Sequence, residues 1–255
     1  MRLRIAAGVT VLLSLTFHQA AAGPLIFPRT SLQVPILMYH YIDHIDPAHP
    51  PRWHRLFIPP DVFDAQLTWL RDNGYTSIDF DDYERIRRGE QLPPLRPVIL
   101  TFDDGYADAS TQVLPRLTAL DMKGVFYVVT GFLGKPGYLT AFQVQGLAAA
   151  GMQIGGHTVT HPDLRRLTRG RRRKELKDSR ETLEALAGRP VVHLAYPAGR
   201  YTAQVIHEVT TLGYHTAVTT RDGIASFSGS PFALPRVRMM TDTSLATVLS
   251  AGSPR

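Results

Sequence analysis

Residues suited to metal and proton chemistry stand at two separate points of the chain. Two adjacent carboxylates, Asp103 and Asp104, follow the apolar run PVILTF and precede Gly105 in VILTFDDGYADAS. Two imidazoles, His157 and His161, stand four residues apart in GGHTVTHPDL, directly after MQIGG. Two imidazoles and one carboxylate form a common open site for Zn²⁺ or a related divalent ion, with positions left for water and substrate.

Both motifs follow segments that are typical of buried strands. In α/β folds with a parallel sheet, the carboxyl ends of the strands meet at one edge, where sites are built. Burying two adjacent carboxylates without a partner is costly, and a cation at the same edge changes that balance. We expect HTVTH (157–161) to make one helical turn, so that its two imidazoles converge on one centre.

The tripeptide FDD also occurs earlier, at residues 80–82 in SIDFDDYERIRR. Polar residues precede this copy, and Tyr83 and Ile86 follow at helical spacing. Asp79 is a good N-cap, and acidic residues in a first turn stabilise the positive end of the helix dipole. We interpret this copy as the start of a helix and assign it no catalytic role.

Apolar runs alternate with amphipathic segments over some 200 residues. Strands are expected at 34–40, 75–78, 97–102, 123–130, 152–157, 191–197, 214–220 and 232–239. Helices are expected at 60–74, 80–88, 107–121, 140–151, 169–187, 202–213 and 244–250. Pro115 should kink the third helix or divide it from a first turn. The alternation indicates an α/β fold with a parallel sheet, and the number of units suits a barrel better than an open sheet.

The N-terminus has the pattern of a signal peptide. Residues 1–22 combine a basic start, an apolar run of about 13 residues and an Ala-x-Ala ending at Ala22. That run is shorter than the roughly 20 residues of a spanning helix, although an uncleaved anchor is the alternative. We expect an exported protein with an N-terminal arm at 23–33 and a single domain at 34–255. The chain has no cysteine, which excludes disulfides, thiol nucleophiles and thiolate ligands.

The net charge is +6, and nine of the 28 basic residues lie at 165–180. Acidic residues are interleaved there, so we interpret the segment as a solvated helix face. The alternative is a patch for an anionic polymer or the envelope surface. Export argues against nucleic acid as a partner.

Four short motifs resemble those of a known family. TFDDGY (101–106) and HTVTHPDL (157–164) resemble the first two motifs of the polysaccharide deacetylases, the NodB-homology family 4 of carbohydrate esterases. PILMYHYI (35–42) and LAYPAGRY (194–201) resemble its poly-N-acetylglucosamine deacetylase branch. The resemblance spans roughly residues 34–240. It implies a distorted (β/α) barrel of the NodB-homology type and metal-dependent removal of N-acetyl, less often O-acetyl, groups from a sugar polymer. We expect the protein to be a monomer.

The resemblance also implies roles for individual residues. Asp104, His157 and His161 match the ligands of a divalent ion, with zinc expected first and cobalt, nickel or iron as alternatives. Asp103 matches the base that takes the proton of the attacking water. A backbone N–H in AYPAG, at Ala198, matches the donor to the oxyanion.

Two departures from the family pattern affect this assignment. No histidine follows His215, so the proton donor to the leaving amine matches His40 in the MYH motif, with a structural histidine as the alternative. Ala195 stands where many relatives carry an arginine that orients the base, and Arg236 is a candidate for that task.

Substrate contacts are the least determined part of the site. Tyr106 and Tyr196 are candidates for stacking on a sugar ring, with capping of the core as the alternative, and Arg236 is a further candidate contact. Poly-N-acetylglucosamine, peptidoglycan and chitin-type oligomers all carry the same acetamide, so discrimination is expected in the loops at 41–60 and 130–140. A catalytically inactive carbohydrate-binding protein on the same scaffold is the alternative function.

Overall fold

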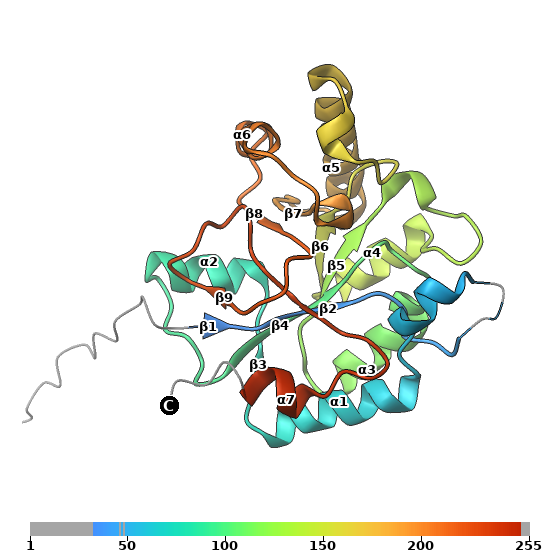
Figure 1. Ribbon diagram of the computed structural model, residues 1–255, viewed down its shortest axis with the longest axis vertical. Coiled ribbons are helices and arrows are strands. Elements are labelled where there is room, and N and C mark those ends of the chain that lie inside the picture. Colours follow the sequence, from blue (N-terminus) through green and yellow to red (C-terminus); the bar gives the residue numbers. More distant parts are fainter. Residues whose placement is uncertain (1–32, 46, 48, 251–255) are drawn as a thin grey trace, which may run out of the picture.

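The computed structural model describes residues 33–45, 47 and 49–250 (Figure 1). The predicted leader at 1–22 and the arm at 23–33, apart from Gln33, lie outside them. Within the described ranges, no helix has the length and apolar character needed to cross a membrane.

Strands and helices alternate along the chain as the sequence predicts. The strands are β1 (Gln33–Val34), β2 (Ile36–Tyr39), β3 (Thr76–Ser77), β4 (Pro97–Phe102), β5 (Val125–Val128), β6 (Gln153–Gly156), β7 (His193–Ala195), β8 (Thr216–Val218), β9 (Ala225–Ser226) and β10 (Val237–Arg238). The α-helices are α1 (Pro60–Asp72), α2 (Phe80–Arg88), α3 (Leu114–Ala119), α4 (Ala141–Ala149), α5 (Arg169–Ala187), α6 (Ala203–Thr211) and α7 (Leu245–Ser250). Short helical turns are η1 (Pro51–Leu56), η2 (Ala109–Val113), η3 (Thr130–Phe132), η4 (Leu164–Arg166) and η5 (Pro197–Gly199). Pro115 lies in the first turn of α3 and follows the π-helical turn η2, so the predicted third helix is divided there.

The main sheet is parallel and curls into a distorted barrel, which confirms the predicted fold class. Its strand order is β10-β2-β4-β5-β6-β7-β8, with β3 beside β4. The segment 231–236 runs along β8, where Thr219 N–H donates to the Leu234 carbonyl at 2.9 Å, and then continues as β10 beside β2. The predicted last strand at 232–239 is regular only over β10, because Pro235 has no N–H for a ladder.

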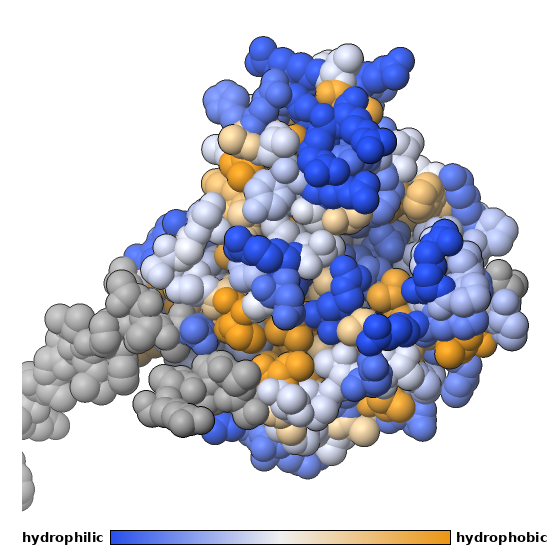
Figure 2. Space-filling view, viewed as in Figure 1, coloured by the Kyte–Doolittle hydropathy of each residue, from blue (hydrophilic) through white to orange (hydrophobic). Residues whose placement is uncertain are grey.

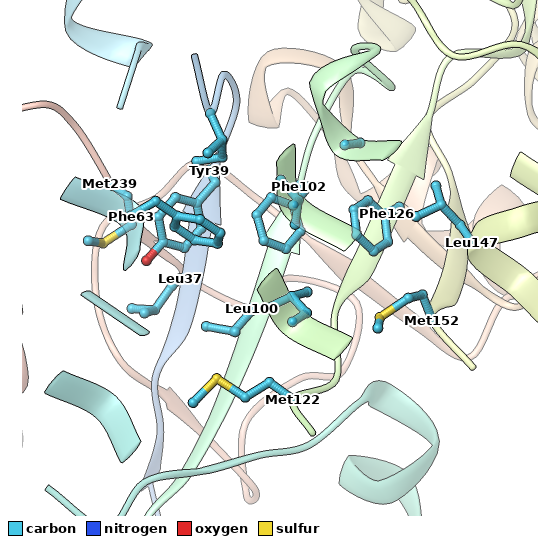
Figure 3. Packing of buried hydrophobic residues seen from close by; sticks show 14 of the residues in the cluster. Leu37, Tyr39, Phe63, Leu100, Phe102, Met122, Phe126, Leu147, Met152 and Met239 are labelled. Carbon is cyan, nitrogen blue, oxygen red and sulfur yellow. The ribbon is translucent and has the colours of Figure 1, made fainter. Parts of the chain in front are cut away.

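Side chains alternate across the strands and so divide into two layers. Leu37 and Tyr39 of β2, with Leu100 and Phe102 of β4, point outward and pack under the helices (Figure 3). The intervening residues of these strands face the barrel interior, where Thr101 lies in line with the carboxylate of Asp103. The alternation continues beyond the last residue of each strand. A residue just after a strand that keeps the inward direction therefore lies at the carboxyl edge of the barrel.

Helix α2 confirms the structural interpretation of the first FDD copy. Asp79 accepts a hydrogen bond from Asp82 N–H at 2.8 Å, and the Asp82 side chain accepts one from Asp79 N–H at 3.3 Å. This capping box supplies partners for backbone donors that a helix start leaves free. Lys123 bridges both carboxylates, at 3.1 and 2.5 Å.

The basic segment at 165–180 is a solvated helix face with one exception. Hydrophilic side chains cover the surface over α5, at the top of Figure 2. Arg172, however, is buried and makes a two-pronged ion pair with Glu208 of α6, with both N–O distances at 2.7 Å. Sequence spacing did not separate this residue from its exposed neighbours.

Asp108 ties the start of η2 to the segment that follows β2. Its carboxylate accepts a hydrogen bond from Ile42 N–H. Burial raises the pKa of Asp108 to about 7, although that hydrogen bond and its local backbone contacts favour the charged form.

The folded protein therefore holds a proton on Asp108 that the unfolded chain releases near pH 4. Because the folded-state pKa is raised, the contribution of Asp108 to stability falls as the pH rises from about 4 to about 7. Asp108→Asn removes this titration and keeps an acceptor for Ile42. We expect the free energy of unfolding of the variant, relative to wild type, to increase by about 1–3 kcal/mol between pH 4 and pH 8 in urea denaturation. A difference between variant and wild type that does not change with pH would contradict this.

Candidate active site

The fold brings Asp104, His157 and His161 together at the carboxyl edge of the barrel. Asp104 Oδ1 lies 3.3 Å from His157 Nε2 and 3.5 Å from His161 Nε2. The three candidate ligand atoms all lie within 4.8 Å of one another. Ligands of a tetrahedral ion with bonds of about 2.0–2.1 Å are separated by about 3.3 Å, so the three residues fit a divalent ion.

Neighbouring groups orient two of these candidate ligands. His157 Nδ1 lies 2.7 Å from the Ala195 carbonyl and donates to it, which leaves Nε2 as the ring nitrogen that faces Asp104. Tyr106 donates its hydroxyl to Asp104 Oδ2 at 3.0 Å, which leaves Oδ1 for the two imidazoles. Burial raises the pKa of Asp104, but the hydrogen bond with His157 and the charges of the nearby histidines lower it by more. The group is therefore a carboxylate at neutral pH.

The predicted helical turn at HTVTH is wrong, because the segment is a loop with left-handed residues. Thr158 has φ of 68° and His161 has φ of 58°, and His161 N–H donates to Thr158 Oγ1 at 3.0 Å. Glu175 of α5 holds the loop between the two imidazoles. It accepts from the N–H groups of Val159 and Thr160, both at 2.9 Å, and from the Thr160 hydroxyl at 2.7 Å.

Backbone strain is concentrated at this edge of the barrel. Within the described residues, five positions other than glycine have positive φ, and four of them belong to the two motifs or to η5. These four are Asp104, Thr158, His161 and Ala198. Such conformations cost of order 1–3 kcal/mol each and persist only where the surroundings enforce them. Here the enforcing contacts include the Glu175 clamp.

Asp103 is held by a buried arginine. Arg236 Nη1 lies 2.7 Å from Asp103 Oδ1, and Arg236 Nη2 lies 2.6 Å from Asp103 Oδ2. The guanidinium also donates to the Thr219 carbonyl at 2.8 Å and to Thr101 Oγ1 at 3.0 Å. Burial raises the pKa of Asp103, but the charge and hydrogen bonds of Arg236 lower it by more, so Asp103 is ionised. Arg236, the candidate for orienting Asp103, therefore contacts that carboxylate directly.

A pocket of about 260 Å³ opens over these groups. Its walls combine the two aspartates and two histidines with residues of neighbouring strands and loops: His40, Tyr41, Trp53, Leu56, Tyr106, Ala198, Thr220 and Arg238. His40 continues the inward phase of β2. Burial lowers its pKa, and Asp104 and Asp103 raise it in part.

Ala198 lies in the turn η5 with φ of 50°. The hydrogen bonds of this turn run from Gly199 N–H to Tyr196 and from Arg200 N–H to Pro197. Neither of them uses the N–H of Ala198, which lies at the pocket wall.

Two of the three candidate substrate contacts are wrong. Tyr196 is completely buried and donates its hydroxyl to the Phe232 carbonyl at 3.1 Å, because it has the outward phase of β7. Arg236 is also completely buried and is occupied by Asp103. Tyr106 does line the pocket, but its ring stacks on Tyr41 with centroids 3.8 Å apart.

Sequence reasoning missed Glu175, Trp53 and Arg238. Glu175 belongs to the segment interpreted as a solvated face, and its loop partners are 15 and 16 residues away in the chain. Trp53 lies in the loop expected to affect substrate discrimination. The signal for Arg238 is its spacing of two residues from Arg236, which gives both side chains the same strand phase.

Glu175→Ala should loosen the loop that carries both histidines without removing a ligand. We expect the affinity for Zn²⁺ to fall about 10–100-fold, as is typical when a group that orients metal ligands is lost. Isothermal titration calorimetry measures this. The matched control is Glu181→Ala in the same helix, which loses only an exposed pair with Lys177 and should bind zinc normally. Equal affinities in the two variants would show that Glu175 does not organise the site.

Comparisons with known proteins agree with this geometry. The family model described as polysaccharide deacetylase matches residues 91–217. The chain is 31% identical over 207 residues to YxkH of Bacillus subtilis (strain 168), a protein named for the polysaccharide deacetylases, with 81% of this chain and 71% of that protein covered. The structure of the Streptococcus pyogenes deacetylase PplD in complex with acetate superposes with a TM-score of 0.81 at 33% identity, covering 88% of this chain and 100% of that chain.

Similarity to the poly-N-acetylglucosamine branch is more restricted. The poly-beta-1,6-N-acetyl-D-glucosamine N-deacetylase of Escherichia coli (strain K12) is 37% identical over 71 residues, which are 28% of this chain and 11% of that protein. The longer matches and the barrel with its two motifs decide the family. The chain belongs to the polysaccharide deacetylase family, hydrolases that act on the N-acetyl groups of sugars.

Proposed function

We propose that this protein is an exported, metal-dependent deacetylase that hydrolyses N-acetyl groups of a polymer containing N-acetylglucosamine. The observation that carries the proposal is the trio Asp104, His157 and His161 beside an ionised Asp103, all lining one pocket. The signal-peptide pattern at 1–22 supports export.

The residues divide the chemistry between them. Asp104, His157 and His161 would hold the ion, which supplies a Lewis acid that activates water and polarises the acetyl carbonyl. Asp103 accepts the proton of the attacking water, because Arg236 keeps it ionised and fixed in orientation. The Ala198 N–H donates to the oxygen that becomes negative, and His40 protonates the leaving amine.

The direct test measures acetate released from a panel of polymers by protein loaded with Zn²⁺, Co²⁺ or Ni²⁺. The panel contains poly-N-acetylglucosamine, chitin-type oligomers, peptidoglycan and an O-acetylated glycan. We expect release from at least one N-acetylated member. Metal-loaded protein that binds these glycans without releasing acetate would instead support the inactive carbohydrate-binding alternative.

The two adjacent aspartates should differ when each is replaced. Asp103→Asn keeps the shape of the side chain but cannot take a proton, so we expect turnover to fall about 10²–10⁴-fold with metal content close to wild type. Asp104→Asn and His157→Ala should lose the metal together with activity. Metal analysis and acetate release on the same samples make the comparison. Loss of metal in Asp103→Asn and retention in Asp104→Asn would reverse the two roles.

A further inference from the structure

Arg238 places a second guanidinium in the pocket, and none of the steps above uses it. It ends β10 and stands two residues after Arg236, which directly precedes that strand, so both side chains have the same inward phase. Arg236 contacts Asp103 in the barrel interior. Arg238 stands two residues further along the chain, nearer the carboxyl edge of the barrel where the pocket opens. There it lines the pocket together with His40 and Trp53.

Within the described residues, no side chain or carbonyl makes a hydrogen bond or ion pair with the Arg238 guanidinium. The carboxylates that act on it through space are Asp103 and Asp104. Asp103 already receives two hydrogen bonds from Arg236, and Asp104 is engaged by Tyr106 and the histidines. Arg238 is half-buried, and arginine does not lose its proton in proteins. A partly desolvated cation without a partner is costly, which indicates that a ligand supplies the partner.

The charge balance of the pocket indicates the kind of ligand. Arg236 neutralises Asp103, and a divalent ion more than neutralises Asp104. The charge of Arg238 is therefore in excess whenever the ion is bound. A neutral N-acetylglucosamine polymer has no charged group to offset it. A carboxylate or a phosphate does, and the planar guanidinium pairs with either through two parallel hydrogen bonds.

We propose that Arg238 binds an anionic substituent, a carboxylate or a phosphate, that the polymer carries beside the acetamide to be hydrolysed. The preferred substrate is then an acidic N-acetylated glycan. This inference rests on the proposed deacetylase function and narrows its substrate class. A second basic residue is next to the pocket residue Trp53: Arg52 is exposed, and its guanidinium lies 5.6 Å from the centroid of the Trp53 ring.

The test compares matched tetrasaccharides that differ in charge. One alternates N-acetylglucosamine with N-acetylmuramic acid and carries lactyl carboxylates, and its methyl ester is the neutral match. A chitin tetramer with one 6-phosphate, paired with the plain tetramer, forms the phosphate arm. The quantity measured is the ratio of kcat/KM for the charged member to that for its neutral match.

Wild type should favour the charged member of at least one pair, and the arm that shows the preference identifies the anion. Arg238→Gln should lower that ratio about tenfold or more, since a hydrogen bond between charged groups is lost. Arg238→Lys should retain part of the preference. The control Arg87→Gln changes an exposed arginine of α2 outside the pocket and should leave the ratio unchanged.

Metal content and the thermal unfolding midpoint show whether each variant is folded. If Arg238→Gln does not fold, the ratio measured for Arg238→Lys is the test. A wild-type ratio near one in both arms would overturn the inference. So would a variant that lowers kcat/KM equally for charged and neutral members. In both cases acetate is still released, so the proposed deacetylase function stands. If that function were wrong, no substrate would release acetate.

Discussion

The buried pair between Asp103 and Arg236 is the interaction on which the site depends. It joins the end of β4 to the last strand of the sheet, on opposite sides of β2. Burying two charges costs free energy that geometry and additional hydrogen bonds must offset, and here Thr101 and Thr219 supply them. The contact that joins these two parts of the sheet thus also orients Asp103, the proposed base.

This pair also explains how two adjacent aspartates take different tasks. Both oxygens of Asp103 accept hydrogen bonds from the guanidinium, which fixes the orientation of that carboxylate. Asp104 has a left-handed backbone, with φ of 73°, and Gly105 continues the turn with φ of 78°. Tyr106 then occupies one oxygen of Asp104 and leaves the other for the histidines. The order of residues in FDDGY therefore provides the proposed base, the proposed ligand, a turn and an orienting hydroxyl.

Much of this arrangement was readable from the sequence. Alternating apolar runs and helices predicted the parallel barrel, and the position of each motif after a strand predicted that the motifs meet at one edge. The phase of β7 also indicates that Tyr196 points outward and is buried, although its place in the AYPAG motif makes it a candidate contact. The loop at 157–161 could not be predicted from spacing, because its left-handed residues are stabilised by Glu175, which belongs to a distant helix. Contacts between segments far apart in the chain, such as Arg236 with Asp103, were accessible only as candidates.

The division of tasks between the two aspartates can be observed in a structure of the protein loaded with one equivalent of Zn²⁺, with the ion located by anomalous scattering. We expect the ion within about 2.2 Å of the ligand atoms of Asp104, His157 and His161, with Asp103 still paired to Arg236. An ion bound by Asp103, or an Arg236 displaced from that carboxylate, would contradict this division.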